Sequence, residues 1–71
     1  MENDAAVIVR RVNPRDIMVF MSDPREGWRR VRLLHKPTGL EGHGEAPTMD
    51  EARAQADAEL DAHFTSAGLE R

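Results

Sequence analysis

The chain has 71 residues, with 10 Lys and Arg against 13 Asp and Glu, and its formal net charge is −3. A chain of this length predicts one small domain over residues 1–71 with a thin core. The absence of Cys excludes a disulfide framework, a thiolate metal site and a Cys nucleophile. The N-terminus lacks an apolar targeting segment, and the longest apolar run, Ile17–Met21, is too short to span a bilayer. We therefore expect a cytoplasmic protein without a membrane segment.

Charge is divided unevenly between the two halves of the chain. Residues 1–36 hold eight Arg and Lys against five Asp and Glu, whereas residues 37–71 hold two against eight. This polarity favours an oriented partner or self-association over uniform attraction to phosphate.

Four segments rich in strand-forming residues are separated by turns that contain Pro or Gly. We expect strands at residues 5–12, 17–21, 28–35 and, more weakly, 40–46, with turns at 13–16, 22–27 and 36–39. Pro47 then ends strand pairing before a helix. The order β-β-β-β-α predicts an α+β fold, in which an antiparallel meander sheet of three or four strands carries one C-terminal helix on one face.

The best-defined element is the helix, expected over residues 48–67. Thr48 and Glu51 have the spacing of a capping box, and Gly68 is typical of a C-terminal stop. Apolar residues at spacings of three and four form the stripe that would pack on the sheet. They are Met49, Ala52, Ala56, Leu60, Phe64 and Ala67.

The two sheet faces follow from the assumed strand register. Four-residue turns at 13–16 and 36–39 place Gly42 and Gly44 opposite Leu33 and Val31, where glycine leaves room for the helix. With Met21 opposite Trp28, the covered face carries Val7, Val9, Met18, Phe20, Val31 and Leu33. The other face then carries Ile8, Val12, Ile17, Val19, Met21, Trp28 and Leu34, interleaved with Arg10, Arg30, Arg32, Glu41, His43 and Glu45. A slip of one residue would exchange the faces of a strand, but residues 17–21 are apolar on both sides.

One helix covers one face of a sheet, so we expect the other face to be an interface. The predicted contact residues are Ile17, Val19, Met21, Trp28, Arg30, Arg32 and His43. We interpret the protein as a non-enzymatic protein–protein interaction module that forms a homodimer or binds another protein. As a hypothesis about its class, we interpret it as a phage or mobile-element accessory protein or inhibitor, because small single-domain proteins of this kind are common among such genes.

Two alternatives remain open for the polar residues of this face. Arg30 and Arg32 can pair with glutamates across the hairpin as a solvated ladder. They can instead join Trp28 in a nucleic-acid-binding domain, because Arg contacts phosphates and guanine edges.

No pattern in the sequence predicts chemistry at a metal or a catalytic group. His35, His43 and His63 lack metal-ligand spacing. Glu41 and Glu45 lie roughly 13 Å apart along one strand, which is too wide for a two-carboxylate mechanism. We expect no metal, no cofactor and no catalytic residue.

Two stretches resemble known families. Residues 31–40, VRLLHKPTGL, resemble the strand-turn-strand of the catalytic domain of class I peptide chain release factors, and this implies a hairpin that precedes a helix. The Gly-Gly-Gln loop of that family is replaced here by residues 23–28, DPREGW, so no hydrolytic residue is carried over. The layout from Trp28 to Leu60 is also similar to the three-stranded-sheet-plus-helix DNA-binding domains of plant ethylene-response factors and phage integrase arms. That likeness implies DNA contacts from Trp28, Arg30 and Arg32.

Overall fold

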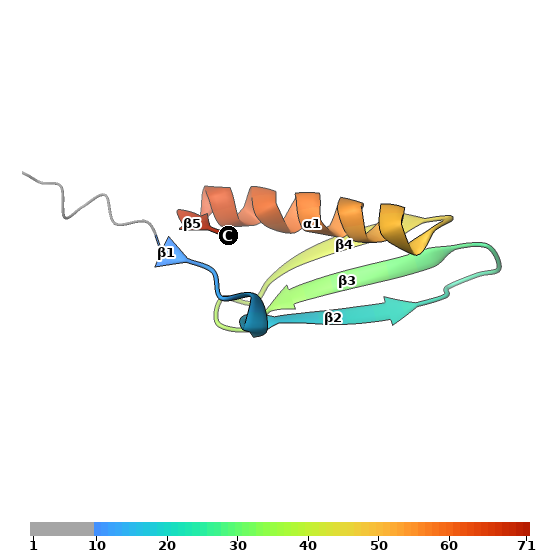
Figure 1. Ribbon diagram of the computed structural model, residues 1–71, viewed down its shortest axis with the longest axis horizontal. Coiled ribbons are helices and arrows are strands. Elements are labelled where there is room, and N and C mark those ends of the chain that lie inside the picture. The colour runs from blue at the N-terminus through green and yellow to red at the C-terminus, as the bar shows by residue number, and fades with distance from the viewer. Residues whose placement is uncertain (1–9) are drawn as a thin grey trace, which may run out of the picture.

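The computed structural model describes residues 10–71, so the predictions for residues 5–9, including the faces of Val7, Ile8 and Val9, lie outside the described residues. Strands β2 (Ile17–Ser22), β3 (Arg29–His35) and β4 (Leu40–Ala46) form an antiparallel sheet in the order β2-β3-β4. Helix α1 (Met49–Ser66) lies along one face of this sheet (Figure 1). The α+β fold with one C-terminal helix is confirmed in its three-stranded form.

Short elements flank this sheet and helix. Strands β1 (Arg10–Arg11) and β5 (Leu69–Glu70) pair in parallel as a separate two-stranded sheet. A 3-10 turn, η2 (Pro14–Asp16), begins where the side chain of Asn13 accepts a hydrogen bond from the Arg15 backbone N–H. Of the segments that the structure describes, no helix is long and apolar enough to cross a membrane.

Local signals set both ends of α1. The Thr48 hydroxyl accepts from the Glu51 N–H at 3.2 Å and donates to the Glu51 carboxylate at 3.1 Å, which satisfies a donor that the first helical turn leaves free. Gly68 follows the helix with a φ of 77°, a left-handed conformation that glycine adopts without a steric penalty. The predicted N-cap and the predicted stop are confirmed, but the Glu51 carboxylate accepts from the Thr48 hydroxyl and not, as a capping box requires, from the Thr48 backbone N–H.

The close approach of α1 to β4 depends on two glycines. A Cβ at Gly44 would overlap the Ala52 carbonyl oxygen, and a Cβ at Gly42 would overlap that of Ala56. These glycines pair with Val31 and Leu33 on β3, so the predicted β3–β4 register is confirmed. Beneath the glycines and alanines, the core is closed by fully buried side chains: Val31, Leu33, Leu60 and Phe64.

The predicted β2–β3 register is wrong. Met21 pairs with Val31 rather than with Trp28, and Val19 pairs with Leu33. The observed partner of Met21 is three residues further along β3 than the predicted one. A register shift by an odd number of residues moves the side chains of a strand to the opposite face of the sheet. Val19 and Met21 therefore lie on the helix side, together with Ile17, which packs partly buried against the core. Met18 and Phe20, predicted for the core, lie on the opposite face.

The N-terminal part of the described chain also differs from prediction. Arg10 and Arg11 pair with β5 and not with β2, so Arg10 is not part of the three-stranded sheet. Val12, predicted on the uncovered face, is buried in the core, and its N–H donates to the Glu70 carbonyl at 2.7 Å. The segment after Gly68 therefore supplies backbone partners for residues 10–12, whose polar groups would otherwise lack them.

Candidate interaction surface

The sheet face opposite α1 is called the uncovered face. Its residues alternate with the core residues of β3 and β4 and comprise Met18, Phe20, Ser22, Arg30, Arg32, Leu34, Glu41, His43 and Glu45. It therefore joins an apolar strip on β2 to a charged strip on β3 and β4.

The charged strip is a cross-strand ladder. Arg30 donates to the Glu45 carboxylate at 3.0 Å, and Arg32 donates to the Glu41 carboxylate at 3.4 Å. His43 Nε2 lies 2.9 Å from the other oxygen of Glu41. The ladder weighed as an alternative in the sequence is thus present, and both arginines already have an acidic partner.

Arg32 links the ladder to the apolar strip. Its guanidinium carbon lies 4.4 Å from the centre of the Phe20 ring, which is a cation–π arrangement. A shallow hollow of about 290 Å³ lies between the strips, lined by Phe20, Met21, Ser22, Arg30, Arg32 and His43.

Strand β2 is exposed on both of its faces. On the helix side, Leu33 and Val31 are fully buried, whereas their β2 partners Val19 and Met21 are 39% and 60% exposed. On the uncovered face, Met18 and Phe20 are about as exposed as Val19. An α-helix is roughly 10 Å wide and covers about two strands at the usual spacing. Because α1 lies over β4 and β3 (Figure 1), β2 projects beyond it.

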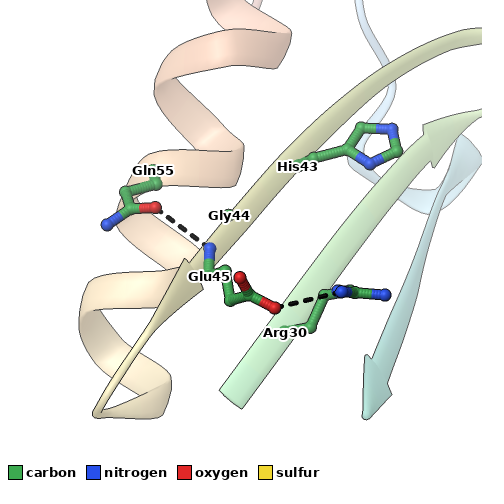
Figure 2. A pocket seen from close by; sticks show the side chains of 5 residues that line it. All are labelled: Arg30, His43, Gly44, Glu45 and Gln55. Atoms are coloured by element: carbon green, nitrogen blue, oxygen red, sulfur yellow. Dashed lines mark hydrogen bonds and ion pairs between the residues drawn. The ribbon is translucent and has the colours of Figure 1, made fainter. Parts of the chain in front are cut away.

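The free edge of β4 is capped by α1. Gln55 Oε1 accepts from the Glu45 backbone N–H at 3.0 Å, and Glu59 Oε1 accepts from the His43 N–H. Figure 2 shows Gln55 reaching from the helix to the strand beside the Arg30–Glu45 pair. A second shallow hollow of about 280 Å³ is lined by Arg30, His43, Gly44, Glu45 and Gln55.

The other flank of α1 carries a second group of ion pairs. Arg71 donates to Asp61 at 2.8 Å and lies 3.1 Å from Asp57, which also pairs with Arg53. The hydrogen bond to Asp61, followed by the contact with Asp57, raises the pKa of Arg71 above its usual value. The guanidinium therefore stays charged and ties the C-terminus to the helix.

Trp28 lies outside the sheet, in the loop between β2 and β3. The Arg25 guanidinium carbon is 4.6 Å from the Trp28 ring centre, and Asp23 pairs with Arg29 at 3.0 Å. The tryptophan is half-buried within its own loop and is separate from the arginine ladder.

The predicted contact residues thus divide into three groups. Arg30, Arg32 and His43 share the uncovered face; Ile17, Val19 and Met21 lie on the helix side; and Trp28 lies in the loop. The exposure of Met18 and Phe20 and the capping role of Gln55 and Glu59 were not predicted from the sequence. The spacing of Gln55 and Glu59 could have indicated the capping pair. Four residues of a helix rise about 6 Å, which is close to the roughly 6.6 Å that two residues of a strand span. Gln55 and Glu59 therefore match alternate N–H groups of β4.

Within residues 10–71, no group of three or more His, Cys, Asp or Glu is arranged to hold a metal ion. His35 is buried, with Nδ1 2.8 Å from the Thr38 hydroxyl and its ring edge-on to Phe64. Comparisons with known protein families, curated proteins and solved structures found no match.

Proposed function

We propose that the protein is a non-enzymatic protein-binding module whose contact surface is β2 with the adjoining uncovered face. The observation that carries this proposal is the run of four consecutive exposed apolar side chains, Met18 to Met21, on a strand at the edge of the sheet. Among residues 10–71, no strand pairs with the outer edge of β2. An apolar strip beside an open edge of backbone groups is a typical template for another chain.

The amount of apolar surface exposed by Met18 to Met21 is consistent with a binding role. Fully burying a side chain of this size contributes about 1.5–3 kcal/mol relative to full exposure. The four side chains retain about two-fifths or more of their exposure, so a partner that covers them gains about 2–5 kcal/mol in total. Backbone pairing and contacts with the ladder would add to this value.

The nucleic-acid alternative has less support from the same surface. Phosphate binding requires cations free to replace the counterions of the backbone, whereas Arg30 and Arg32 are paired with Glu45 and Glu41. Apolar residues beside paired charges are more typical of a protein interface.

Site-directed photo-crosslinking tests the protein-binding proposal. Phe20 is replaced by benzoylphenylalanine, which keeps an aromatic ring on the uncovered face, and the matched control carries the same group at Ala58, an exposed position on the far side of α1. In extract of the native host, we expect discrete protein adducts from position 20 that excess unmodified chain competes away. Equal adducts from both positions, or none from position 20, would reject β2 as a protein-contact surface.

A titration with random duplex DNA tests the alternative. The unmodified chain should show no binding at tens of micromolar protein in low salt. The double variant Glu41→Gln with Glu45→Gln releases both arginines and should bind measurably, with affinity that falls by about one log unit per contact for each tenfold rise in salt. Salt-sensitive binding by the unmodified chain would instead favour the nucleic-acid function.

A further inference from the structure

Within residues 10–71, one edge of the three-stranded sheet is protected and the other is left open. At β4, Gln55 and Glu59 occupy outward N–H groups, so another strand cannot pair there without displacing them. Between Ile17 and Met21, β2 contains no charge, no Pro and no Gly, although such residues are the usual means by which edge strands avoid pairing. Any strand added to the sheet would therefore join at β2.

The ladder between β2 and β3 determines which β2 groups point outward. The Lys36 N–H donates to the Asp16 carbonyl at 3.0 Å, which makes these two residues a hydrogen-bonded pair in register with the ladder. Bonded and non-bonded pairs alternate along antiparallel strands. Residues 18, 20 and 22 therefore bond to β3, and the N–H and C=O groups of Ile17, Val19 and Met21 point away from the sheet.

We propose that the partner at this edge is a second copy of the chain, with β2 paired antiparallel to β2 and a two-fold axis passing beside Val19. This inference rests on the proposed function, because it identifies the partner of the same surface. Centring the pairing on Val19 places Ile17 opposite Met21 of the second copy and Val19 opposite itself. The outward N–H and C=O groups of all three residues then face those of the second copy, which allows about six backbone hydrogen bonds. Centring the pairing on Phe20 would match only Val19 and Met21 and would allow about four.

The side chains are complementary in the same register. Val19 meets Val19 on the helix side, and Met18 meets Phe20 of the second copy on the uncovered face, a sulfur–aromatic contact. No like charges face each other, because this strand has none. Residues that face each other in this register are an even number apart in the sequence, so they point to the same face of the joined sheet. The two-fold axis is therefore perpendicular to the sheet, and both helices lie on the same side of it.

The position of α1 leaves room for this arrangement. Each helix lies over β3 and β4 (Figure 1), so the two helices of a six-stranded sheet are separated by about 15–20 Å at normal strand spacing. Packed helices lie 8–10 Å apart, and the copies therefore meet through their strands without a clash between helices.

Single-cysteine variants test both partner and register, because the natural chain has no Cys. Under mild oxidation, Val19→Cys should form a disulfide-linked dimer by itself. Met18→Cys and Phe20→Cys should each crosslink poorly alone and efficiently when mixed, because each faces the other position. Ala58→Cys is the control and should stay monomeric. Crosslinking of Val19→Cys no faster than the control would overturn the pairing.

Sedimentation equilibrium and amide exchange on the full chain complete the test. From 1 to 200 μM we expect a reversible dimer, in which the amides of Ile17, Val19 and Met21 are protected together with those of Met18 and Phe20. Met21→Lys places a charge at the most exposed position of β2 and should raise the dissociation constant of the dimer at least tenfold. The amides at positions 17, 19 and 21 should then lose protection, while those of Met18 and Phe20 keep it. Ala58→Lys should change neither measurement.

Two other outcomes would reject the proposal that the partner is a second copy of the chain, and both can be told apart from failure of the proposed binding function. A monomer at 200 μM whose outward β2 amides exchange freely would remove self-pairing, while position-20 crosslinks to a different protein would still support a binding module. A monomer with protected outward amides would show that another segment of the same chain occupies the edge.

Discussion

The position of α1 on β4 leaves β2 uncovered, and Gly44→Ala tests that position directly. An alanine Cβ would overlap the Ala52 carbonyl oxygen and come within 2.8 Å of both the Ala56 nitrogen and the Gln55 Cβ. Backbone atoms on a helix cannot swing aside as a flexible side chain can, so the whole helix has to lift from the strand.

Lifting α1 has two costs in the free energy of unfolding. Overpacking a core typically costs about 1–3 kcal/mol, and the displaced helix also weakens contacts over Val31 and the bond from Glu45 to Gln55. We expect a loss of about 2–4 kcal/mol. A chain of this length has about 4–10 kcal/mol in total, so the variant should be near the limit of folding.

Urea unfolding followed by circular dichroism measures this loss, and amide exchange at Glu45 locates it. The control is Gly27→Ala, a site with no neighbour near a new Cβ but with a φ of 79°. It should cost about 1–2 kcal/mol through backbone strain alone and should leave the Glu45 amide protected. A change below about 0.5 kcal/mol for Gly44→Ala, the range of neutral surface substitutions, would show that α1 does not lie this close to β4.

Three further variants address the helix and the protected edge. Leu60→Ala removes a fully buried side chain and should lower the free energy of unfolding by about 2–4 kcal/mol; a loss under about 0.5 kcal/mol in urea would place Leu60 outside the core. Thr48→Ala removes the N-cap acceptor and should cost about 1 kcal/mol in the same assay, whereas no change would mean that the cap contributes nothing. Gln55→Ala should accelerate exchange of the Glu45 amide without altering that of Val31, and unchanged exchange would contradict the edge cap.

The sequence predicted the parts of the fold that depend on short-range chemistry. Pro37 and Gly39 define a tight turn, so the register between β3 and β4 could be counted outward from it. The capping pair Thr48 and Glu51, together with Gly68, located the helix ends in the same way. Gly42 and Gly44 then identified where the helix approaches, because their register was already known.

The register between β2 and β3 lacked such a marker. The loop at residues 23–28 is held by its own contacts, Arg25 with Trp28 and Asp23 with Arg29. It does not correspond to a standard turn type, so the number of unpaired residues between β2 and β3 could not be predicted from the sequence. Residues 17–21 are apolar throughout, so both registers bury an equally apolar side. The predicted site consequently paired Val19 with the arginines, while the residue that contacts Arg32 is Phe20.

The exposed apolar surface of β2 and the small size of the domain have the same origin. One helix covers about two strands, and in this chain the helix lies over β4 and β3, because Gly42 and Gly44 of β4 allow the closest approach. The third strand then carries apolar side chains that the helix does not reach. A chain that functions alone would reduce this surplus with charges on β2, as it does on β3 and β4, where Arg30, Arg32, Glu41 and Glu45 alternate with core residues. Because β2 has no such residues between Ile17 and Met21, we propose that its exposed surface is an interface and not an uncovered remainder of the core.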